Sequence, residues 1–421
     1  MKILFIIEQP EIFEKIKDPN YVNPGVGGTT FTTLRMAELL KKSKTIASKK
    51  LEIYLGILNG ANGVFNDIPI CNLKKNNTLW DVVVLTGGTI DLLYFKKFNI
   101  KCKRKIAWLR HPYDWDKILK SKNLGAEILS VGKAQFLTNF LITGNHHRIN
   151  NIFNAKRIRK AADFDFENTL NKKFKKKTTL RIGYMGALIY SKGFHLLAKE
   201  WGNIKRIFKQ KNIKVELHVI GGSSLYGLSE DHQILPCGRA YGDLITKLLE
   251  GDISNIFFYG KLDQQRYKIM QNIDIAVANP LGQGEAFPAT ILEWISLGIP
   301  TIAPQSYGFG DVMNYLPQMV LKNISHLPNK INYLFNLKRQ EKIDLFYQNI
   351  VLSNMFSAEE ELILAKWEFL LGIKNSELKI NGLLNRKIFF IAIKEYINML
   401  LLYTIDKIKR KLSKIKKLLN R

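Results

Sequence analysis

The stretch LRIGYMGALIYSKGFHLLAKEW, residues 180–201, joins an apolar run of strand length to an amphipathic helical segment through a short loop with glycines. Similar apolar runs recur along the chain. They are KILFIIEQ, LEIYLGIL, DVVVLTGG, KIAWLRH, AEILSVG and INNIFNA before it, and VELHVIGG, NIFFYG, IDIAVANP, PTIAP and MVL after it. The segments TLRMAELLKK, AQFLTNFLI, DLITKLLEG, QQRYKIMQNI and ATILEWISLG predict helices between these strands. This alternation predicts an α/β fold, with two Rossmann-like, doubly wound parallel sheets.

A basic stretch poor in apolar residues, ENTLNKKFKKKTTL, interrupts the alternation and predicts a linker. A later segment, AEEELILAKWEFLLG, predicts a helix capped by Ser357 with Glu360 in the capping-box position. The predicted organisation is an N-terminal domain at 1–166, a linker at 167–179, a C-terminal domain at 180–355, a helix at 356–374 that crosses back toward the N-terminal domain, and a tail at 375–421.

The composition indicates a globular protein with a large interior, because 46% of the 421 residues are hydrophobic and 24% are charged. The net charge of +28 favours anionic partners: phosphates, nucleic acid or an acidic membrane. A general bias toward lysine is the alternative explanation for this charge.

The three cysteines, Cys71, Cys102 and Cys237, show no disulfide or metal-ligand spacing, so we expect a reducing, cytoplasmic compartment and no metal. We expect the start, MKILFIIEQPEIF, to be a buried strand and not a signal peptide.

The segment from Arg386 to Arg421 predicts a basic amphipathic helix. It holds eleven Lys/Arg and two Asp/Glu, and no run of about 18 uncharged apolar residues that would predict a spanning helix. Its apolar stripe consists of Leu401, Ile405, Ile408, Leu412, Ile415 and Leu419. Such a helix can lie on an anionic bilayer, so we expect peripheral association with the inner face of the cytoplasmic membrane. A coiled-coil or core-docking helix is the alternative.

The segment GQGEAFPATILEWISLGIPTIA, from Gly282 to Ala303, carries two glutamates near a predicted helix start. Glu285 lies in the loop after a strand, and Glu293 lies early in the following helix. In a parallel sheet both would lie at the carboxyl ends of the strands, where ligands bind. By itself the spacing is weak, because glutamates near a helix start also stabilise its dipole.

The loop GALIYSKG, Gly186 to Gly193, places Lys192 and Gly193 at a predicted helix N-terminus. A lysine there, together with the helix amides, can neutralise a diphosphate. Without other evidence, Lys192 would be an ordinary exposed loop lysine.

Taken together, these two segments resemble the signatures of the retaining, family-four (group 1) glycosyltransferases. In the first, Glu285, Phe287, Glu293, Gly298 and Pro300 match the family pattern, while Ala286 and Pro288 replace its two glycines. In the second, Gly186, Lys192 and Gly193 match, and Ala187 replaces the family's arginine.

The resemblance implies the GT-B fold, in which the two domains face a cleft, and transfer of a sugar with retention from a UDP- or GDP-sugar without a metal or other cofactor. It implies that Glu285 orients the sugar, Lys192 neutralises the diphosphate and Glu293 binds the ribose. Phe287 and Ala289 would line the donor site with the glycines of the loop. The acceptor would be a glycan or a lipid-linked glycan in surface polysaccharide synthesis.

The N-terminal half carries softer matches to the same family. PGVGGTTFTTLRMAELL places Gly27 and Gly28 before a helix, where the resemblance implies contact near the donor phosphate; a tight turn is the alternative. His111 ends a predicted strand, and the resemblance places it beside the donor sugar, with Arg110 and Asp114 as lesser candidates. We expect Ser130 and Asn154 to be structural.

Several alternatives remain open. The Asp-x-Asp patterns at 114–116 and 163–165 resemble those of metal-dependent sugar transferases, but we interpret them as solvated turns. A sugar-nucleotide epimerase, a glycan phosphorylase and a degenerate GT-B protein that binds nucleotide or glycan could share the fold. We see no helix-turn-helix, zinc pattern or basic strand set with interleaved aromatics that would predict nucleic-acid binding.

Overall fold

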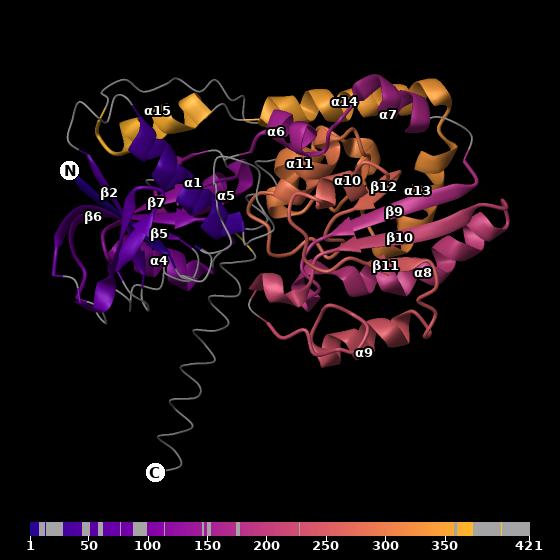
Figure 1. Cartoon of the computed structure of the whole chain (residues 1–421), viewed down its shortest axis with the longest axis horizontal. Helices are drawn as coiled ribbons and strands as arrows, with labels where there is room; N and C mark the ends of the chain where they lie inside the picture. The colour runs from indigo at the N-terminus through magenta and orange to yellow at the C-terminus, as the bar shows by residue number, and fades with distance from the viewer. Residues whose placement is uncertain are drawn as a thin grey trace, which may run out of the picture. The chain divides into compact units, whose positions relative to one another are not determined.

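The computed structural model describes residues 1–7, 13, 28–43, 51–57, 62–75, 77–86, 99–112, 114–144, 147–149, 153–173, 177–226, 228–357, 360–373 and 397. The chain divides into two compact units: unit 1 comprises Met1–Pro10, Thr33–Asn151 and Glu361–Arg421, and unit 2 comprises Glu11–Thr32 and Ile152–Glu360 (Figure 1). Each unit holds one largely parallel sheet, so the predicted α/β class with two Rossmann-like sheets is confirmed. The predicted tail at 375–421, Ile397 apart, lies outside the described residues.

Unit 1 is built on an eight-stranded sheet with the order β3-β4-β2-β1-β5-β6-β7-β8, in which only the β3–β4 pair is antiparallel. The central strands carry runs of fully buried aliphatic residues, as a sheet covered on both faces requires. The strands are β1 (Lys2–Ile7), β2 (Glu52–Ile57), β3 (Gly63–Phe65), β4 (Ile68–Asn72), β5 (Leu79–Thr86), β6 (Lys101–Leu109), β7 (Ala126–Ser130) and β8 (His147–Arg148). The helices are α1 (Gly28–Lys42, within this unit from Thr33), α4 (Trp115–Asn123), α5 (Lys133–Thr143) and α15 (Glu360–Leu370, within it from Glu361).

Helix α15 completes the core of unit 1 although it lies far from the rest of the unit in sequence. The indole of Trp367 is fully buried, with its ring centroid 5.0 Å from that of Trp108 and 5.8 Å from that of Phe5. Arg104 makes two 2.8 Å hydrogen bonds to the carboxylate of Glu127 and a third to the carbonyl of Leu370. This segment is therefore an integral part of the N-terminal sheet's packing.

Unit 2 is built on a five-stranded, wholly parallel sheet with the order β11-β10-β9-β12-β13. The chain starts at β9, winds outward through β10 and β11, and then returns to the other side of β9 for β12 and β13. The order therefore reverses between β9 and β12, which makes their carboxyl ends the topological switch point.

The strands of unit 2 are β9 (Thr179–Met185), β10 (Lys214–Ile220), β11 (Ile256–Phe258), β12 (Ile275–Val277) and β13 (Thr301–Ile302). The helices are α6 (Ala155–Ala161), α7 (Phe166–Lys173), α8 (Phe194–Lys209), α9 (Arg239–Leu248), α10 (Arg266–Met270), α11 (Ala289–Ser296), α12 (Gly310–Met313), α13 (Leu327–Asn336) and α14 (Arg339–Phe356).

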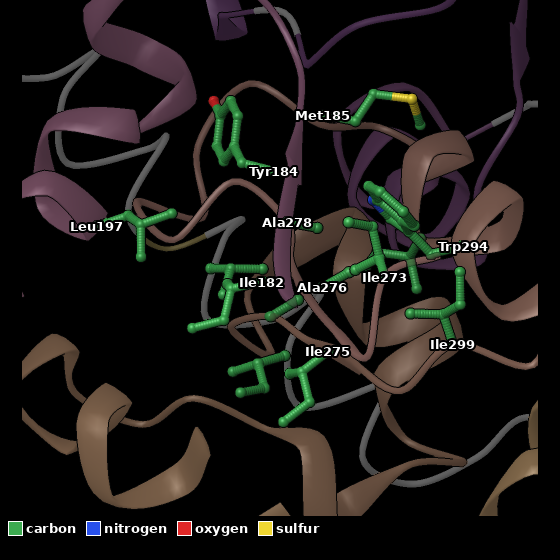
Figure 2. Close-up of a cluster of buried hydrophobic side chains, with 14 of the residues drawn as sticks. Ile182, Tyr184, Met185, Leu197, Ile273, Ile275, Ala276, Ala278, Trp294 and Ile299 are labelled. Atoms are coloured by element: carbon green, nitrogen blue, oxygen red, sulfur yellow. The ribbon is translucent and has the colours of Figure 1, made fainter. Parts of the chain in front are cut away.

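Side chains packed against both faces of β9 form the core of unit 2. Figure 2 shows Tyr184 and Leu197 on one side of the strand and Ile273 and Trp294 on the other. Gly183, the residue before Tyr184 in β9, has no room for a side chain: an added Cβ would lie 2.8 Å from the indole of Trp294 and 2.9 Å from Ile273. The small residue lets α11 pack close to the strand whose end carries the candidate site.

Some predicted elements differ from the structure. INNIFNA was predicted to be a strand at 149–155, but Phe153 and Asn154 are not in a strand, and Asn154 instead caps α6 by accepting a 3.1 Å hydrogen bond from the Arg157 amide. A capping asparagine competes with strand pairing for the backbone, which explains the difference. Helix α7 occupies much of the predicted linker. Ser357 is the C-cap of α14; residues 358 and 359 lie outside the described residues, so its predicted role as the cap of the next helix stays a prediction.

Candidate functional site in unit 2

The candidate site lies at the carboxyl ends of β9 and β12. After β9 the chain runs through Gly186 into the short helix η4 (Tyr190–Lys192) and then into α8. After β12 it runs through a loop, residues 278–288, into α11. The sheet order reverses between these strands, so the two loops diverge to opposite faces of the sheet. Residues at the start of both loops therefore lie at the carboxyl ends of β9 and β12.

Lys192 and Glu285 meet at this edge. The Nζ atom of Lys192 lies 2.6 Å from Oε1 of Glu285, and the two side chains are only 11% and 21% exposed. The backbone supports the lysine, because the Tyr184 hydroxyl donates a 2.9 Å hydrogen bond to its carbonyl. A charge-assisted bond in a largely desolvated position is strong and directional. The structure thus joins two residues that the sequence proposed separately.

Gly193 allows the turn that presents Lys192. Its φ of +71° is in the left-handed region, and an added Cβ would lie 2.6 Å from the backbone nitrogen of Leu281. Both the conformation and the close approach therefore require glycine. Gly186, the other glycine of the predicted loop, donates its amide to the Ile220 carbonyl at 3.0 Å and thus ties the end of β9 to β10.

The backbone amides at the start of α8 are less available to a ligand than the sequence predicts, because one of them already has a protein partner. The amide of His195 donates a 3.1 Å hydrogen bond to the Tyr241 hydroxyl, so a tyrosine already satisfies one of the helix's free amides. The His195 ring stacks on Tyr190, with ring centroids 4.2 Å apart. Burial lowers the pKa of His195 and raises that of Tyr241, so both groups are held neutral near pH 7. The result is a neutral aromatic surface beside Lys192.

Glu293 lies in α11, as predicted, and is paired with an arginine that the sequence did not reveal. Arg266 Nε lies 3.2 Å from Glu293 Oε2, and the arginine side chain is only 6% exposed. The same guanidinium donates to the Asp263 carbonyl at 2.9 Å and lies over the Tyr267 ring, 4.3 Å from its centroid. The carboxylate of Glu293 is therefore held by a buried cation on α10. A buried guanidinium needs an anionic or polar partner, but the sequence around Arg266 does not show which residue provides it.

The other residues of the loop before α11 serve mainly to shape it. Phe287 packs on Phe356, with ring centroids 6.2 Å apart, and Ala289 donates its amide to the Phe287 carbonyl at 3.0 Å. Pro288 occupies the N-cap position of α11, where a missing amide costs nothing. Ala187, which stands where the family resemblance has arginine, is buried.

The remaining predicted site residues belong to other elements of the chain. His111 follows β6 in unit 1, and its carbonyl accepts a 2.9 Å hydrogen bond from the Gln135 side chain. Gly28 is the first residue of α1, and Gly27 lies outside the described residues. Ser130 is fully buried, and its hydroxyl accepts a 3.0 Å hydrogen bond from Asn139, a structural role.

The two Asp-x-Asp patterns form helix starts. Asp114 caps α4 by accepting a 2.8 Å hydrogen bond from the Lys117 amide, and Asp116 pairs with Lys120 at 2.6 Å. Asp165 accepts a 3.0 Å hydrogen bond from the Asn168 amide. In the part of the chain that the structure describes, no group of three His, Cys, Asp or Glu residues is arranged to hold a metal ion. None of the helices described there is long and apolar enough to cross a bilayer.

Residues 179–335 match the family model described as glycosyl transferases group 1, a span that runs from β9 into α13 and contains both ion pairs of the site. No curated protein matches the sequence.

The chain is similar in fold to several solved structures. HepE of Anabaena, in complex with UDP and glucose, superposes with a TM-score of 0.55 at 14% identity, over 88% of this chain and 99% of that one. A glycosyltransferase of Rickettsia africae gives a TM-score of 0.57 at 16% identity, over 89% and 99%. Sucrose-phosphate synthase of Thermosynechococcus elongatus gives 0.60 at 11% identity, also over 89% and 99%. These likenesses show the fold, which is the two-domain GT-B fold, and the family match places a group 1 glycosyltransferase domain at 179–335.

Proposed function

We propose that this protein is a GT-B glycosyltransferase that transfers a sugar, with retention, from a UDP- or GDP-sugar to a glycan or lipid-linked glycan acceptor. The observation that carries the proposal is the Lys192–Glu285 pair at the switch point of unit 2, inside the span that matches group 1 glycosyltransferases. The UDP in the HepE structure supports a nucleotide donor by analogy. A role in surface polysaccharide synthesis is the wider context we propose.

In the proposed reaction, the bond between the anomeric carbon and the diphosphate oxygen breaks, and a bond from the acceptor oxygen to that carbon forms on the same face. The acceptor's proton passes to the departing diphosphate. Lys192 would stabilise the charge that develops on the diphosphate, which is the largest electrostatic need of the step. Glu285 would accept hydrogen bonds from the sugar hydroxyls, and the family resemblance gives His111 a supporting role at the sugar.

Donor binding would rearrange the Lys192–Glu285 pair. With no donor, each charge is the other's partner. A diphosphate competes for the ammonium, and sugar hydroxyls then replace the ammonium at the carboxylate. Glu293, held by Arg266, would bind the ribose hydroxyls with a carboxylate whose orientation is already set. We propose that this arrangement needs no metal, which full activity in EDTA would support.

We also propose that residues 386–421 hold the protein on the inner face of the cytoplasmic membrane. Their net charge and apolar stripe carry this proposal, which rests on the sequence alone. Co-sedimentation with anionic but not zwitterionic vesicles, abolished when 386–421 are deleted, is the expected result. Equal binding to both kinds of vesicle would argue for a helix that docks on protein.

The test of the main proposal is a thermal-shift panel with UDP, GDP, ADP and CMP, without added metal. A ligand that binds only the folded state raises the melting temperature by mass action. We expect a shift with UDP or GDP, followed by donor turnover in the presence of an acceptor extract.

A shift without turnover would favour the second candidate, a degenerate GT-B protein that binds nucleotide or glycan without transferring sugar. The burial of Ala187 where the resemblance has an arginine is the observation that favours this alternative. Turnover without an acceptor would favour an epimerase.

A further inference from the structure

A cavity lies in unit 2, at the amino ends of the parallel strands, whereas the candidate donor site lies at their carboxyl ends. Its volume is about 440 Å³, and its walls come from the amino ends of β9 and β12 and from α13 and α14. The donor site lies at the carboxyl ends of the same strands, so the cavity and the donor site are at opposite ends of the strands of one sheet (β9 and α13 are labelled in Figure 1). The volume falls within the range of small-molecule sites in proteins.

The interior of this cavity is apolar. Leu180 and Ile275 come from the strands, Leu334 and Phe335 from α13, and Leu345 and Phe346 from α14. None of these side chains carries a polar group that could orient a sugar or a nucleotide. The cavity is therefore suited to a hydrocarbon chain, which it would remove from water.

The charged residues that line the cavity are three cations and one carboxylate: Lys177, Arg339, Lys342 and Asp274. Lys177 is paired with Asp274, whose other oxygen accepts a 2.8 Å hydrogen bond from the Arg181 amide. The carboxylate is thus already satisfied. Lys342 donates to the Phe335 carbonyl at 2.6 Å, and no carboxylate of the described residues forms an ion pair with it or with Arg339.

Arg339 and Lys342 give this apolar cavity a positive charge, which favours binding of an anion. Burial lowers the pKa of Lys342, the charge of Lys177 lowers it further, and the nearby carboxylate of Asp274 opposes both effects without cancelling them. A bound anion would offset both effects. Residues 386–421 are not a suitable anionic partner, because their eleven Lys/Arg and two Asp/Glu would repel the same cations.

We propose that this cavity binds a single-chain lipid with an anionic head, the chain lying against Leu180, Phe335 and Phe346 and the head meeting Arg339 and Lys342. A guanidinium and an ammonium suit a carboxylate or a phosphate head equally well. The proposal is for a single chain because the cavity has a volume of only about 440 Å³. This site does not depend on the proposed sugar transfer.

The experiment titrates the full-length protein with palmitate and with hexadecyl phosphate, below their micellar concentrations, by calorimetry and native mass spectrometry. Hexadecanol and hexadecyltrimethylammonium are the matched neutral and cationic probes. We expect one saturable equivalent with at least one anionic probe, and about tenfold weaker binding or none with the other two. A preference between the anionic heads would identify the natural head as carboxylate or phosphate. Equal affinity for hexadecanol, or no saturable binding of any probe, would overturn the proposal.

Variants separate this cavity from the basic tail, which is also expected to attract anionic lipids. Arg339→Gln should weaken binding about tenfold, whereas Arg239→Gln should not change it. The two arginines are a matched pair, since both are exposed and each is the first residue of a helix. Leu337→Trp, at the half-buried edge of the cavity, should abolish the saturable equivalent by filling the space. If all variants bind like the unmodified protein, the lipid binds elsewhere and the proposal is wrong; the exposed Arg339 keeps the test valid if Leu337→Trp does not fold.

Discussion

The ammonium of Lys192 and the carboxylate of Glu285 lie 2.6 Å apart although 93 positions separate the two residues in the chain. One follows β9 and the other follows β12, so only the reversal of sheet order at these strands brings them together. Each residue thus has two roles in our proposal, as the other's partner without donor and as a donor ligand when the nucleotide sugar binds.

Replacing the carboxylate of Glu285 should strongly reduce turnover without unfolding the protein. For Glu285→Gln we expect a loss of kcat of about 10²- to 10³-fold, because a single preorganised contact to the reacting group contributes that much. The measurement is sugar transfer from the donor identified in the nucleotide panel. Glu167→Gln, an exposed glutamate in α7 of the same unit, should retain full activity. An active Glu285→Gln protein would show that this residue is not at the reaction centre.

The ion pair should also be visible in stability, independently of activity. Because both side chains are largely buried, Lys192→Met or Glu285→Gln alone leaves one buried charge without its partner. We expect each single change to lower the free energy of unfolding by about 1–3 kcal/mol, and the double variant to lose less than the sum. Denaturant titrations of the four proteins measure this coupling. Strict additivity would mean that the two charges do not interact in solution.

The turn at Gly193 should tolerate no side chain. Gly193→Ala combines a left-handed backbone with a contact to Leu281, so we expect a loss of about 2–4 kcal/mol in unfolding free energy, and weaker nucleotide binding because the turn carries Lys192. Gly202→Ala, inside helix α8, which Gly193 precedes, is the control: nothing lies within 4 Å of its added Cβ, and it should stabilise the protein by up to about 1 kcal/mol. Equal effects of the two changes would show that the backbone at Gly193 relaxes freely.

The pH dependence of stability should report on Lys366 in α15. Burial, with a contribution from Arg148, lowers the pKa of Lys366 to about 8 in the folded protein, while the unfolded lysine titrates near 10.5. Between these values the unfolded chain holds more protons than the folded one, so this group makes stability rise with pH from about 8 to 10.5. At pH 7 the buried charge destabilises the fold, and Lys366→Met should unfold at a higher temperature than the unmodified protein.

The advantage of Lys366→Met should shrink as the pH rises above 8, because the unmodified protein then loses its buried charge. Thermal melts of both proteins between pH 7 and 9.5 measure it. Lys199→Met, an exposed lysine in α8, is the control and should show no such trend. A constant difference across this range would mean that Lys366 titrates as it does in the unfolded chain.

Much of the fold could be predicted because local patterns specify it. The apolar runs at β1, β2, β5, β6 and β7, and at β9 and β10, are long enough to be buried on both faces, and a parallel arrangement follows from the helices between them. The short β3–β4 hairpin, and the helices α13 and α14, were not predicted. The buried residues of α14 lie on one helical face, but two of them, Asn349 and Ser353, are polar, so no apolar stripe marks this helix in the sequence.

The site was predicted as separate loops, and sequence alone determined which residue types stand at each strand end. Lysine and glycine follow β9, glutamate follows β12, and a glycine with a positive φ permits the turn at Gly193. The tertiary structure decided the partners: Glu285 for Lys192, Arg266 for Glu293, and Tyr241 for the amide of His195. Partner choice depends on how strands far apart in sequence are ordered in the sheet. A local pattern carries no record of that order, because hydrophobic periodicity specifies that a strand is buried but not which strand lies beside it.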